Sequence, residues 1–260
     1  MKRIHLFEFM DLDRYPDFLR RIQTNILQVV MNQTKGFDYA VPYIDDMLAK
    51  TKCGTLTDLC SGAAGPWLRI YNKLKSKVNL RLSDKFPNGK MFEKIKKDTN
   101  GEIDYIGSPI DVLDADFKEN AVYTMFTAFH HFKPDEVKTI LKNIQDKRAA
   151  ICIFDYAPAK GLVLALSPLT FIIGILQFYF LSFLVRPFTL TRLLFTNIIP
   201  VVPLVSAWDG IVSALRKYDK DSLLAITKDI EKPGYTWKAE CDFSLSKSSP
   251  MVCLLGRPED

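Results

Sequence analysis

One stretch near the first quarter of the chain constrains the fold more than any other. Residues 55–70 read TLTDLCSGAAGPWLRI, which predicts a short buried strand ending near Asp58, a bend of small residues and a helix that begins at Pro66. Gly62 and Gly65 adopt a positive φ without steric cost, and proline suits the first helical position because its missing N–H would have no partner there. A strand, a small-residue bend and a helix in this order build a ligand site at the carboxyl edge of an open α/β sheet.

The glycine spacing of this bend separates two classes of nucleotide-binding sheet. A nicotinamide fingerprint, G-x-G-x-x-G, would need a glycine at position 60, where this chain has cysteine. The pattern D-x-C-x-G-x-x-G resembles instead the first motif of class I S-adenosylmethionine-dependent methyltransferases. The resemblance implies S-adenosylmethionine as the cofactor, with the free N–H groups of the bend facing its methionine carboxylate. Six residues of this motif are then expected to bind it: Asp58, Cys60, Ser61, Gly62, Ala63 and Gly65.

Further apolar segments predict strands that alternate with helices. Four of them continue the sheet at residues 78–82, 103–106, 121–126 and 149–154. Near the end, period-two alternation over 237–243 and an apolar run over 250–255 predict an antiparallel hairpin. The predicted class is therefore α/β, with a Rossmann-like, mostly parallel sheet closed by a C-terminal antiparallel hairpin. This order resembles the same methyltransferase family over residues 50–158 and 219–257.

Acidic residues follow the second and third predicted strands. A carboxylate at the end of the second strand holds ribose hydroxyls because it accepts two hydrogen bonds at once, and Asp84, followed by Lys85, stands there. By resemblance, Asp111 with Val112 occupies the adenine-binding position after the third strand. Two nearby acids remain open as the true counterpart, Asp114 and Asp116.

Candidate acid–base residues follow the fourth and fifth strands. Methyl transfer from a sulfonium needs mainly alignment and a dry site, and it needs a base only when the acceptor must lose a proton. His130 and His131 titrate near neutral pH, which suits that role, and Asp155 with Tyr156 ends the fifth strand. Because adjacent side chains point in different directions, we expect at most one histidine to face the site. Thr127, just after the fourth strand, completes the expected cofactor contacts.

Two segments lie outside the predicted sheet, and the first is N-terminal. Apolar spacing predicts helices over residues 18–30 and 39–50, so we expect a helical cap at 1–50 and a methyltransferase domain at 51–260. The cap either covers the cofactor and shapes the acceptor pocket or only packs against one edge of the sheet. The sequence leaves both alternatives open.

The second segment is an apolar insertion after the fifth strand, at about 160–210. Residues 162–185 carry no charge, and one helix of this length would measure about 36 Å, enough to cross a hydrocarbon core of about 30 Å. A single crossing is excluded because the terminal hairpin must rejoin the sheet on the original side. The insertion is then a re-entrant hairpin, a set of interfacial helices or an apolar cap buried against protein or a second copy of the chain.

Small, weakly polar residues recur at near-helical spacing in this insertion: Ser167, Thr170, Gly174, Gln177 and Ser182. We expect that face to pack on protein or to line a tunnel while the opposite face meets lipid. Three cations are placed to meet anionic headgroups: Lys160, Arg186 and Arg192. The sequence therefore predicts membrane-surface contact through residues 162–207, with a homo-oligomer as the alternative. The apolar block before Trp208-Asp209-Gly210 resembles a subgroup of uncharacterised bacterial methyltransferase-like proteins.

Composition narrows the partners and the compartment. The net charge of +5 is too mild to indicate nucleic acid, and five cysteines without a C-x-x-C pair are typical of a reducing compartment. With no signal peptide at the start, we expect a cytoplasmic protein, peripheral or re-entrant at a membrane. Three histidines without the helical i, i+4 spacing of zinc sites predict no metal centre.

These features favour methyl transfer to an apolar small molecule or a lipid-like acceptor. An RNA or protein methyltransferase is one alternative. It is disfavoured because no nucleophilic cysteine follows the fourth strand and no Asn-Pro-Pro-Tyr motif is present. A non-catalytic, cofactor-binding membrane scaffold is the other alternative.

Overall fold

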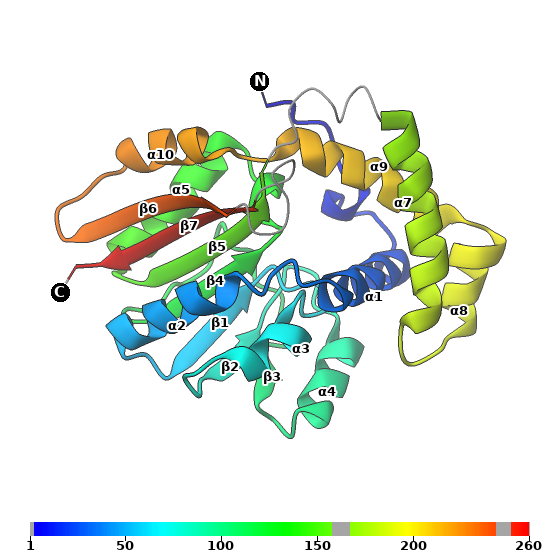
Figure 1. The fold of residues 1–260 in the computed structure, drawn as a ribbon, viewed down its shortest axis with the longest axis horizontal. Helices are drawn as coiled ribbons and strands as arrows, with labels where there is room; N and C mark the ends of the chain where they lie inside the picture. Colours follow the sequence, from blue (N-terminus) through cyan, green and yellow to red (C-terminus); the bar gives the residue numbers. More distant parts are fainter. Residues whose placement is uncertain (1–2, 158–166, 243–250, 260) are drawn as a thin grey trace.

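A seven-stranded sheet organises the chain, in the order β3-β2-β1-β4-β5-β7-β6. The computed structural model describes residues 3–157, 167–242 and 251–259 (Figure 1). Strands β1 to β5 are parallel, whereas β7 is antiparallel to both β5 and β6. The strands are β1 (Thr55–Leu59), β2 (Asn79–Leu82), β3 (Ile103–Tyr105), β4 (Val122–Phe126), β5 (Ala150–Tyr156), β6 (Tyr235–Asp242) and β7 (Met251–Pro258). The predicted α/β class, parallel sheet and terminal hairpin are confirmed.

The direction of strand order reverses at β1, which positions a crevice at the carboxyl edge. Asp58 on β1 pairs with Leu82 on β2 and with Thr124 on β4. The chain leaves β1 toward β2 and β3 on one side and reaches β4 and β5 on the other. The loops after β1, β2 and β4 therefore meet where open α/β sheets bind ligands.

Helices cover both faces of the sheet. On one face lie α2 (Ala40–Thr51), α3 (Trp67–Ile70) and α4 (Gly89–Asp98), and on the other lie α5 (Pro134–Asp146) and α10 (Lys220–Lys228). Side chains of β5 alternate between the two faces and contribute to both cores. Cys152 and Phe154 pack on the first face, and Ile151 and Ile153 pack on the second. Each β5 side chain from Ala150 to Asp155 is buried, as expected for a central strand of a two-sided sheet.

Side-chain hydrogen bonds cap the starts of α5 and α10, and a third helix is shorter than expected. The Lys133 N–H donates to Glu136 Oε2 at 2.6 Å at the start of α5, and Asp219 caps α10 by accepting from the Ser222 N–H at 2.8 Å. The helix expected from Pro66 starts one residue later, at Trp67. It has four residues and passes into a 3₁₀ turn, η2 (Tyr71–Lys73).

Three further helices stand beyond the carboxyl edge of the sheet. They are α1 (Asp17–Gln33), α7 (Ser167–Leu181) and α9 (Val201–Arg216), and they share a core with Ile26, Phe178 and Val202 (Figure 1). Between α7 and α9 the chain forms three short turns: η4 (Ser182–Leu184), α8 (Leu190–Leu193) and the π-turn η5 (Leu194–Ile198). Helices α7 and α9 pack closely at Gly174, where an added Cβ would lie 3.3 Å from Ala207 Cβ.

The two N-terminal helices have different positions. Helix α2 packs on the sheet through Ile44 and Met47. Helix α1 instead docks on the bend after β1, where Asn32 Nδ2 donates to the Gly65 carbonyl at 2.7 Å and Gln28 Nε2 donates to the Ala63 carbonyl. The boundary at residue 50 stays a prediction.

In its described part, the apolar insertion forms several helical segments rather than one long helix. Helix α7 has 15 residues, and residues 158–166 lie outside the described part of the chain. In the described part of the chain, no single helix is both long enough and apolar enough to cross a bilayer. The bent pair Leu190–Ile198 and Val201–Arg216, at 67° to each other, meets that criterion by length and composition.

The expected role of Arg192 at lipid headgroups is wrong. Its side chain is buried, and its guanidinium donates to the carbonyls of Pro187 at 2.8 Å and Val185 at 3.0 Å. These bonds close the turn between α7 and α8. Arg186 is exposed and donates to the Phe183 carbonyl at 2.8 Å, and Lys160 lies outside the described residues.

Candidate active site

A cavity of about 1070 Å³ lies between the carboxyl edge of the sheet and the layer formed by α1, α7 and α9. One wall consists of the loops after β1, β2, β3, β4 and β5. The opposite wall consists of the three helices and the N-terminal segment 5–11, which includes the 3₁₀ turn η1 (Phe9–Asp11). This cavity holds nearly every residue that the sequence analysis selected.

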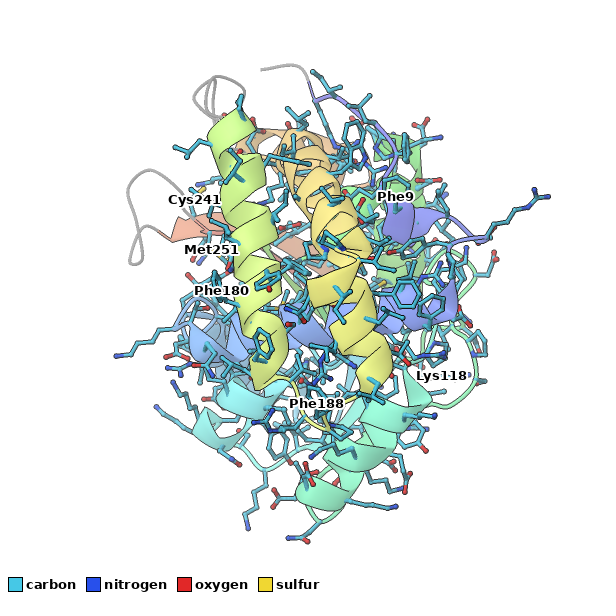
Figure 2. All side chains as sticks on the ribbon, turned by 90° about the vertical axis from the view of Figure 1, so that its right-hand side faces the viewer. Phe9, Lys118, Phe180, Phe188, Cys241 and Met251 are labelled. Atoms are coloured by element: carbon cyan, nitrogen blue, oxygen red, sulfur yellow. The ribbon has the colours of Figure 1, made fainter. Side chains whose placement is uncertain are left out.

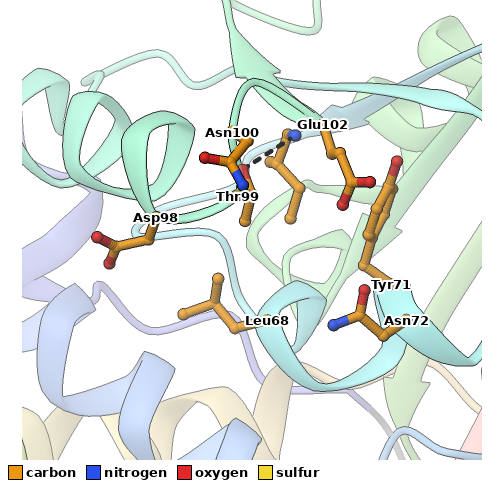
Figure 3. A pocket seen from close by; sticks show the side chains of 8 residues that line it. Leu68, Tyr71, Asn72, Asp98, Thr99, Asn100 and Glu102 are labelled. Carbon is orange, nitrogen blue, oxygen red and sulfur yellow. Dashed lines mark hydrogen bonds between the residues drawn. The ribbon is translucent and has the colours of Figure 1, made fainter.

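A second pocket, of about 190 Å³, lies elsewhere (Figure 3). It is formed by α3, η2 and the connection from α4 to β3, where the Ile103 N–H donates to Thr99 Oγ1 at 3.2 Å. Because Ile103 begins β3, this pocket lies toward the amino end of that strand. None of the predicted site residues lines it, so the large cavity is the candidate active site.

The bend after β1 has an unusual backbone that faces the cavity. The φ angles of Cys60, Gly62, Ala64 and Gly65 are 54°, 57°, 79° and 46°. Side chains tolerate this left-handed region poorly, so the bend depends on its glycines and small residues. A Cβ on Gly62 would also lie 3.3 Å from Thr24 Cγ2, which shows how closely α1 covers the bend.

Asp84 joins the bend to the end of β2. Its Oδ2 accepts from the Gly62 N–H at 2.7 Å, and its Oδ1 accepts from the Phe86 N–H at 2.8 Å. Burial raises the pKa of Asp84, although the two backbone hydrogen bonds and nearby cations oppose this effect. Each carboxylate oxygen keeps a further lone pair for a hydroxyl group.

The loop after β3 completes this wall. Asp111 Oδ2 lies 3.1 Å from Lys85 Nζ, and Asp111 Oδ1 accepts from the Leu113 N–H at 3.1 Å. Val112 is buried beside them and lines the cavity. Of the three acids considered after β3, Asp111 belongs to the wall and the other two, Asp114 and Asp116, do not.

Asp58 is the one predicted cofactor residue that lies behind the wall. Its side chain is 2% exposed, and its Oδ1 accepts from Thr124 Oγ1 at 2.7 Å. Burial raises the pKa of Asp58 to about 6, against the hydrogen bonds it accepts. Its carbonyl accepts from Ser61 Oγ at 2.9 Å and Ser83 Oγ at 2.7 Å, so Asp58 holds the bend in place. Thr127 lines the cavity with a φ of 48°.

His130 and Asp155 form a buried pair on the same wall. His130 Nδ1 lies 2.7 Å from Asp155 Oδ2, and the His130 side chain is buried. Burial alone would raise the pKa of Asp155, but His130 outweighs burial and the net shift is downward. An ionised Asp155 favours the proton on Nδ1. His130 Nε2 is buried without a hydrogen-bond partner among the described residues and lies 4.0 Å from Glu8 Oε1.

His131 lies beside His130, which corrects the expectation that one histidine at most would face the site. The 3₁₀ turn η3 (Phe129–His131) places the two ring centroids 4.4 Å apart, and both rings line the cavity. His131 Nδ1 lies 2.6 Å from Asp11 Oδ1. Burial lowers the pKa of His131, but Glu8 and Asp11 outweigh it and raise the pKa to about 9.

Sequence reasoning missed the residues that complete this cluster. Glu8 is 2% exposed, and its Oε1 lies 3.2 Å from Arg216 Nη1, which also lies 2.5 Å from Asp11 Oδ2. Lys217 Nζ lies 4.7 Å from the ring centroid of Tyr156, and burial lowers the pKa of this lysine. The available signal was a charged residue inside the apolar run Leu-Phe-Glu-Phe at the N-terminus.

Comparison with known proteins identifies the fold. No family model and no curated protein matches the chain. A phospholethanolamine N-methyltransferase 2 from Haemonchus contortus, solved with phosphomonomethylethanolamine and S-adenosylhomocysteine, aligns with a TM-score of 0.54 at 10% identity, over 97% of this chain and 59% of its own. This protein has the class I methyltransferase fold. The family resemblance read from the motif after β1 is thereby confirmed at the level of the fold.

Two other solved structures align with this chain less closely. An O-methyltransferase family protein from Burkholderia thailandensis has a TM-score of 0.48 at 11% identity, over 86% of this chain and 57% of its own. The magnesium protoporphyrin IX methyltransferase of Synechocystis has a TM-score of 0.46 at 12% identity, over 85% and 83%. The chain spans little more than half the length of the first structures it matches.

Proposed function

We propose that the protein transfers a methyl group from S-adenosylmethionine to an apolar small-molecule or lipid-like acceptor at a membrane surface. One observation carries this proposal: a single cavity joins the strand-end wall of the methyltransferase fold to an apolar helix layer. S-adenosylmethionine, when bound, supplies a methyl group on a sulfonium, which is already a good leaving group.

The strand-end wall fits an adenosine cofactor. Asp84 keeps free lone pairs for ribose hydroxyls, and Asp111 with Val112 stands where the adenine would lie. The backbone of the bend from Cys60 to Gly65 faces the cavity with small side chains, so a ligand can approach its N–H groups. Lys85 pairs with Asp111 at the edge of this wall.

The acceptor's reacting group belongs at the other end of the strand-end wall, beside His130 and His131. Asp155 holds His130 through Nδ1 and so orients Nε2, which makes it a positioning residue. Glu8, His130 and Asp155 are all buried, which limits the access of water to this end of the cavity. In this proposal the acceptor loses its proton within this cluster.

The helix layer supports an apolar acceptor and a lipid surface. Thr170, Gly174 and Gln177 of α7 line the cavity, so the small-residue stripe faces inward. The outer face of the layer exposes large apolar side chains (Figure 2), among them Leu169, Ile172, Leu176, Phe180, Phe188 and Leu190. Contiguous exposed apolar surface on this scale is typical of an interaction site. A lipid-like acceptor then enters the cavity from the membrane, past helix α7.

Calorimetric titration with S-adenosylmethionine and S-adenosylhomocysteine tests the cofactor. We expect one molecule to bind per chain. Asp84→Asn should weaken binding at least about tenfold because a charge-assisted hydrogen bond to a hydroxyl contributes about 1.5–3 kcal/mol. Asp116→Asn is the matched control, since Asp116 lies outside the cavity and pairs with Lys118. Absence of binding by the folded wild-type protein contradicts the proposed function, and unchanged affinity in Asp84→Asn contradicts the assigned ribose contact.

A further inference from the structure

Metal-ligating side chains from two distant parts of the chain meet on the cavity wall. Glu8, His130 and His131 each present one ligand atom, and these atoms all lie within 4.8 Å of one another. Glu8 Oε1 lies 4.0 Å from His130 Nε2, and Glu8 Oε2 lies 3.8 Å from His131 Nδ1. Two imidazoles and one carboxylate form a donor set that zinc and iron(II) sites use.

Each of the three side chains already has a charged partner behind it. His130 Nδ1 lies 2.7 Å from Asp155, and His131 Nδ1 lies 2.6 Å from Asp11. Histidines that bind metals almost always donate their second ring N–H to a carboxylate or carbonyl, and in His130 this arrangement leaves Nε2 for the ion. Arg216 Nη1 lies 3.2 Å from Glu8 Oε1, which keeps a further lone pair for an ion. These partners have the arrangement of an outer coordination sphere.

The environment of His130 Nε2 supports a metal site independently of the donor set. With Nδ1 donating to Asp155, Nε2 presents a lone pair, yet it is buried without a hydrogen-bond partner among the described residues. The atom opposite it, Glu8 Oε1, is also an acceptor, and their separation of 4.0 Å is too long for a hydrogen bond. Zinc lies about 2.0–2.1 Å from imidazole nitrogen and about 2.0–2.2 Å from carboxylate oxygen, so one ion spans this gap.

The charges around the gap favour a cation. Three carboxylates surround it, those of Glu8, Asp11 and Asp155, and Arg216 is the guanidinium that pairs with the first two. Lys217 adds a positive charge at the edge, over the ring of Tyr156. The three carboxylates outnumber the two cations, Arg216 and Lys217, by one, so a divalent ion that displaces the proton of His131 meets a negative surrounding.

We propose that Glu8, His130 and His131 bind one divalent first-row transition-metal ion, of the zinc or iron(II) class. Three protein ligands leave a further coordination position toward the cavity, as in catalytic sites. Resting on the proposed function, this ion would bind a hydroxyl group of the acceptor and lower its pKa. The acceptor class is then an apolar or lipid-like alcohol. The absence of i, i+4 histidine spacing does not exclude such a site, because Glu8 arrives from the N-terminal segment.

The test uses the full-length protein after chelator treatment. We expect Zn²⁺, followed by calorimetry, and Co²⁺, followed by its visible d–d absorption, to bind with one ion per chain, and Mg²⁺ to show no binding. Glu8→Gln and His131→Asn should each weaken Zn²⁺ binding by more than about 100-fold. Asp155→Asn should weaken it by about 10- to 100-fold because it removes a second-sphere partner. His5→Asn is the matched control: it removes the third histidine, which lines the cavity outside the ligand set.

The outcomes separate the metal site from the proposed function. No stoichiometric Zn²⁺ or Co²⁺ binding, or binding that persists in both Glu8→Gln and His131→Asn, overturns the site. If a variant loses its cooperative thermal transition, the wild-type Co²⁺ spectrum decides: nitrogen and oxygen ligation supports the site, and a thiolate charge-transfer band overturns it. S-adenosylmethionine binding is measured separately, so cofactor binding without metal overturns the site alone. Metal binding without cofactor overturns the proposed function alone.

Discussion

Asp58 is an ionisable side chain buried at the centre of the sheet, and this has a cost in stability. Its pKa in the folded protein is about 6, against an ordinary value of 3.8. The folded state therefore holds the proton more tightly than the unfolded chain, and stability rises as the pH falls from about 6 to about 4. Above pH 6, ionisation costs about 3 kcal/mol.

Asp58→Asn removes this cost. We expect the variant to be more stable than wild type by up to about 3 kcal/mol at pH 8, with the difference vanishing near pH 4. The amide oxygen still accepts from Thr124 Oγ1, so the local hydrogen bond is kept. Urea unfolding of both proteins at the two pH values measures the effect. A variant that is less stable than wild type at pH 8 contradicts it.

The candidate site residues were predictable where they directly follow the end of a strand. His130, Asp155 and Asp84 were identified because loops after parallel strands converge at one edge. The position of Glu8 beside His130 was not predictable, because the N-terminal segment has no periodic pattern that positions it. Nor did the residue types alone separate Asp111 from Asp114 and Asp116, because all three are aspartates of one loop and only Asp111 lines the cavity.

At the scale of elements, the terminal hairpin depends on one glycine. Gly256 on β7 pairs with Trp237 on β6, and a Cβ at position 256 would lie 2.2 Å from the indole ring. Gly256→Ala must displace Trp237 and its hydrogen bond from Nε1 to Gln145 Oε1, which is 2.8 Å long. We expect a loss of about 1–3 kcal/mol in the free energy of unfolding.

Gly54→Ala is the control for this prediction. No heavy atom of the described residues lies within 4 Å of a Cβ built at Gly54, so its effect should stay within about 0.5 kcal/mol. Denaturant titration compares the two variants. Equal stability of Gly256→Ala and wild type would mean that the ring has room to move.

Helix α7 shows what the charge-free run over 162–185 could not determine. Such a run contains no signal for the end of a helix, and α7 ends inside it, at Leu181. In the structure, Ser182 Oγ donates to the Tyr179 carbonyl at 2.7 Å and bonds Asn197 Oδ1 at 3.1 Å. These contacts with η5 accompany the change from α-helix to a 3₁₀ turn, and they depend on packing across the insertion.

At the scale of the molecule, the outer face of α7 is the surface proposed to meet lipid. We expect the wild-type protein to float with liposomes of mixed neutral and anionic lipids. Ile172→Glu combined with Phe180→Glu should remove flotation, since both side chains are more than half exposed and burying two charges in lipid is costly. Leu224→Glu is the control, because Leu224 is exposed on α10, which lies far from α7 (Figure 1).

The control should float like wild type. If wild-type protein stays at the bottom of the gradient and light scattering shows a dimer that the double variant lacks, the apolar face covers a second copy of the chain and the lipid proposal is wrong. Both variants change side chains that point away from the sheet, so we expect cofactor binding to persist. Cofactor binding then shows that each variant is folded.

The sequence by itself determined the fold class, the succession of strands and helices along the chain and the candidates for the cofactor wall. These features depend on local periodicity and on small residues at a bend, which are readable within a few neighbouring positions. Only the tertiary structure decided how the cavity is closed and which groups surround His130. The contact between Glu8 and Arg216 joins residues 208 positions apart. Such contacts arise when α9 and the N-terminal segment pack together over the sheet edge, and no local pattern encodes their meeting.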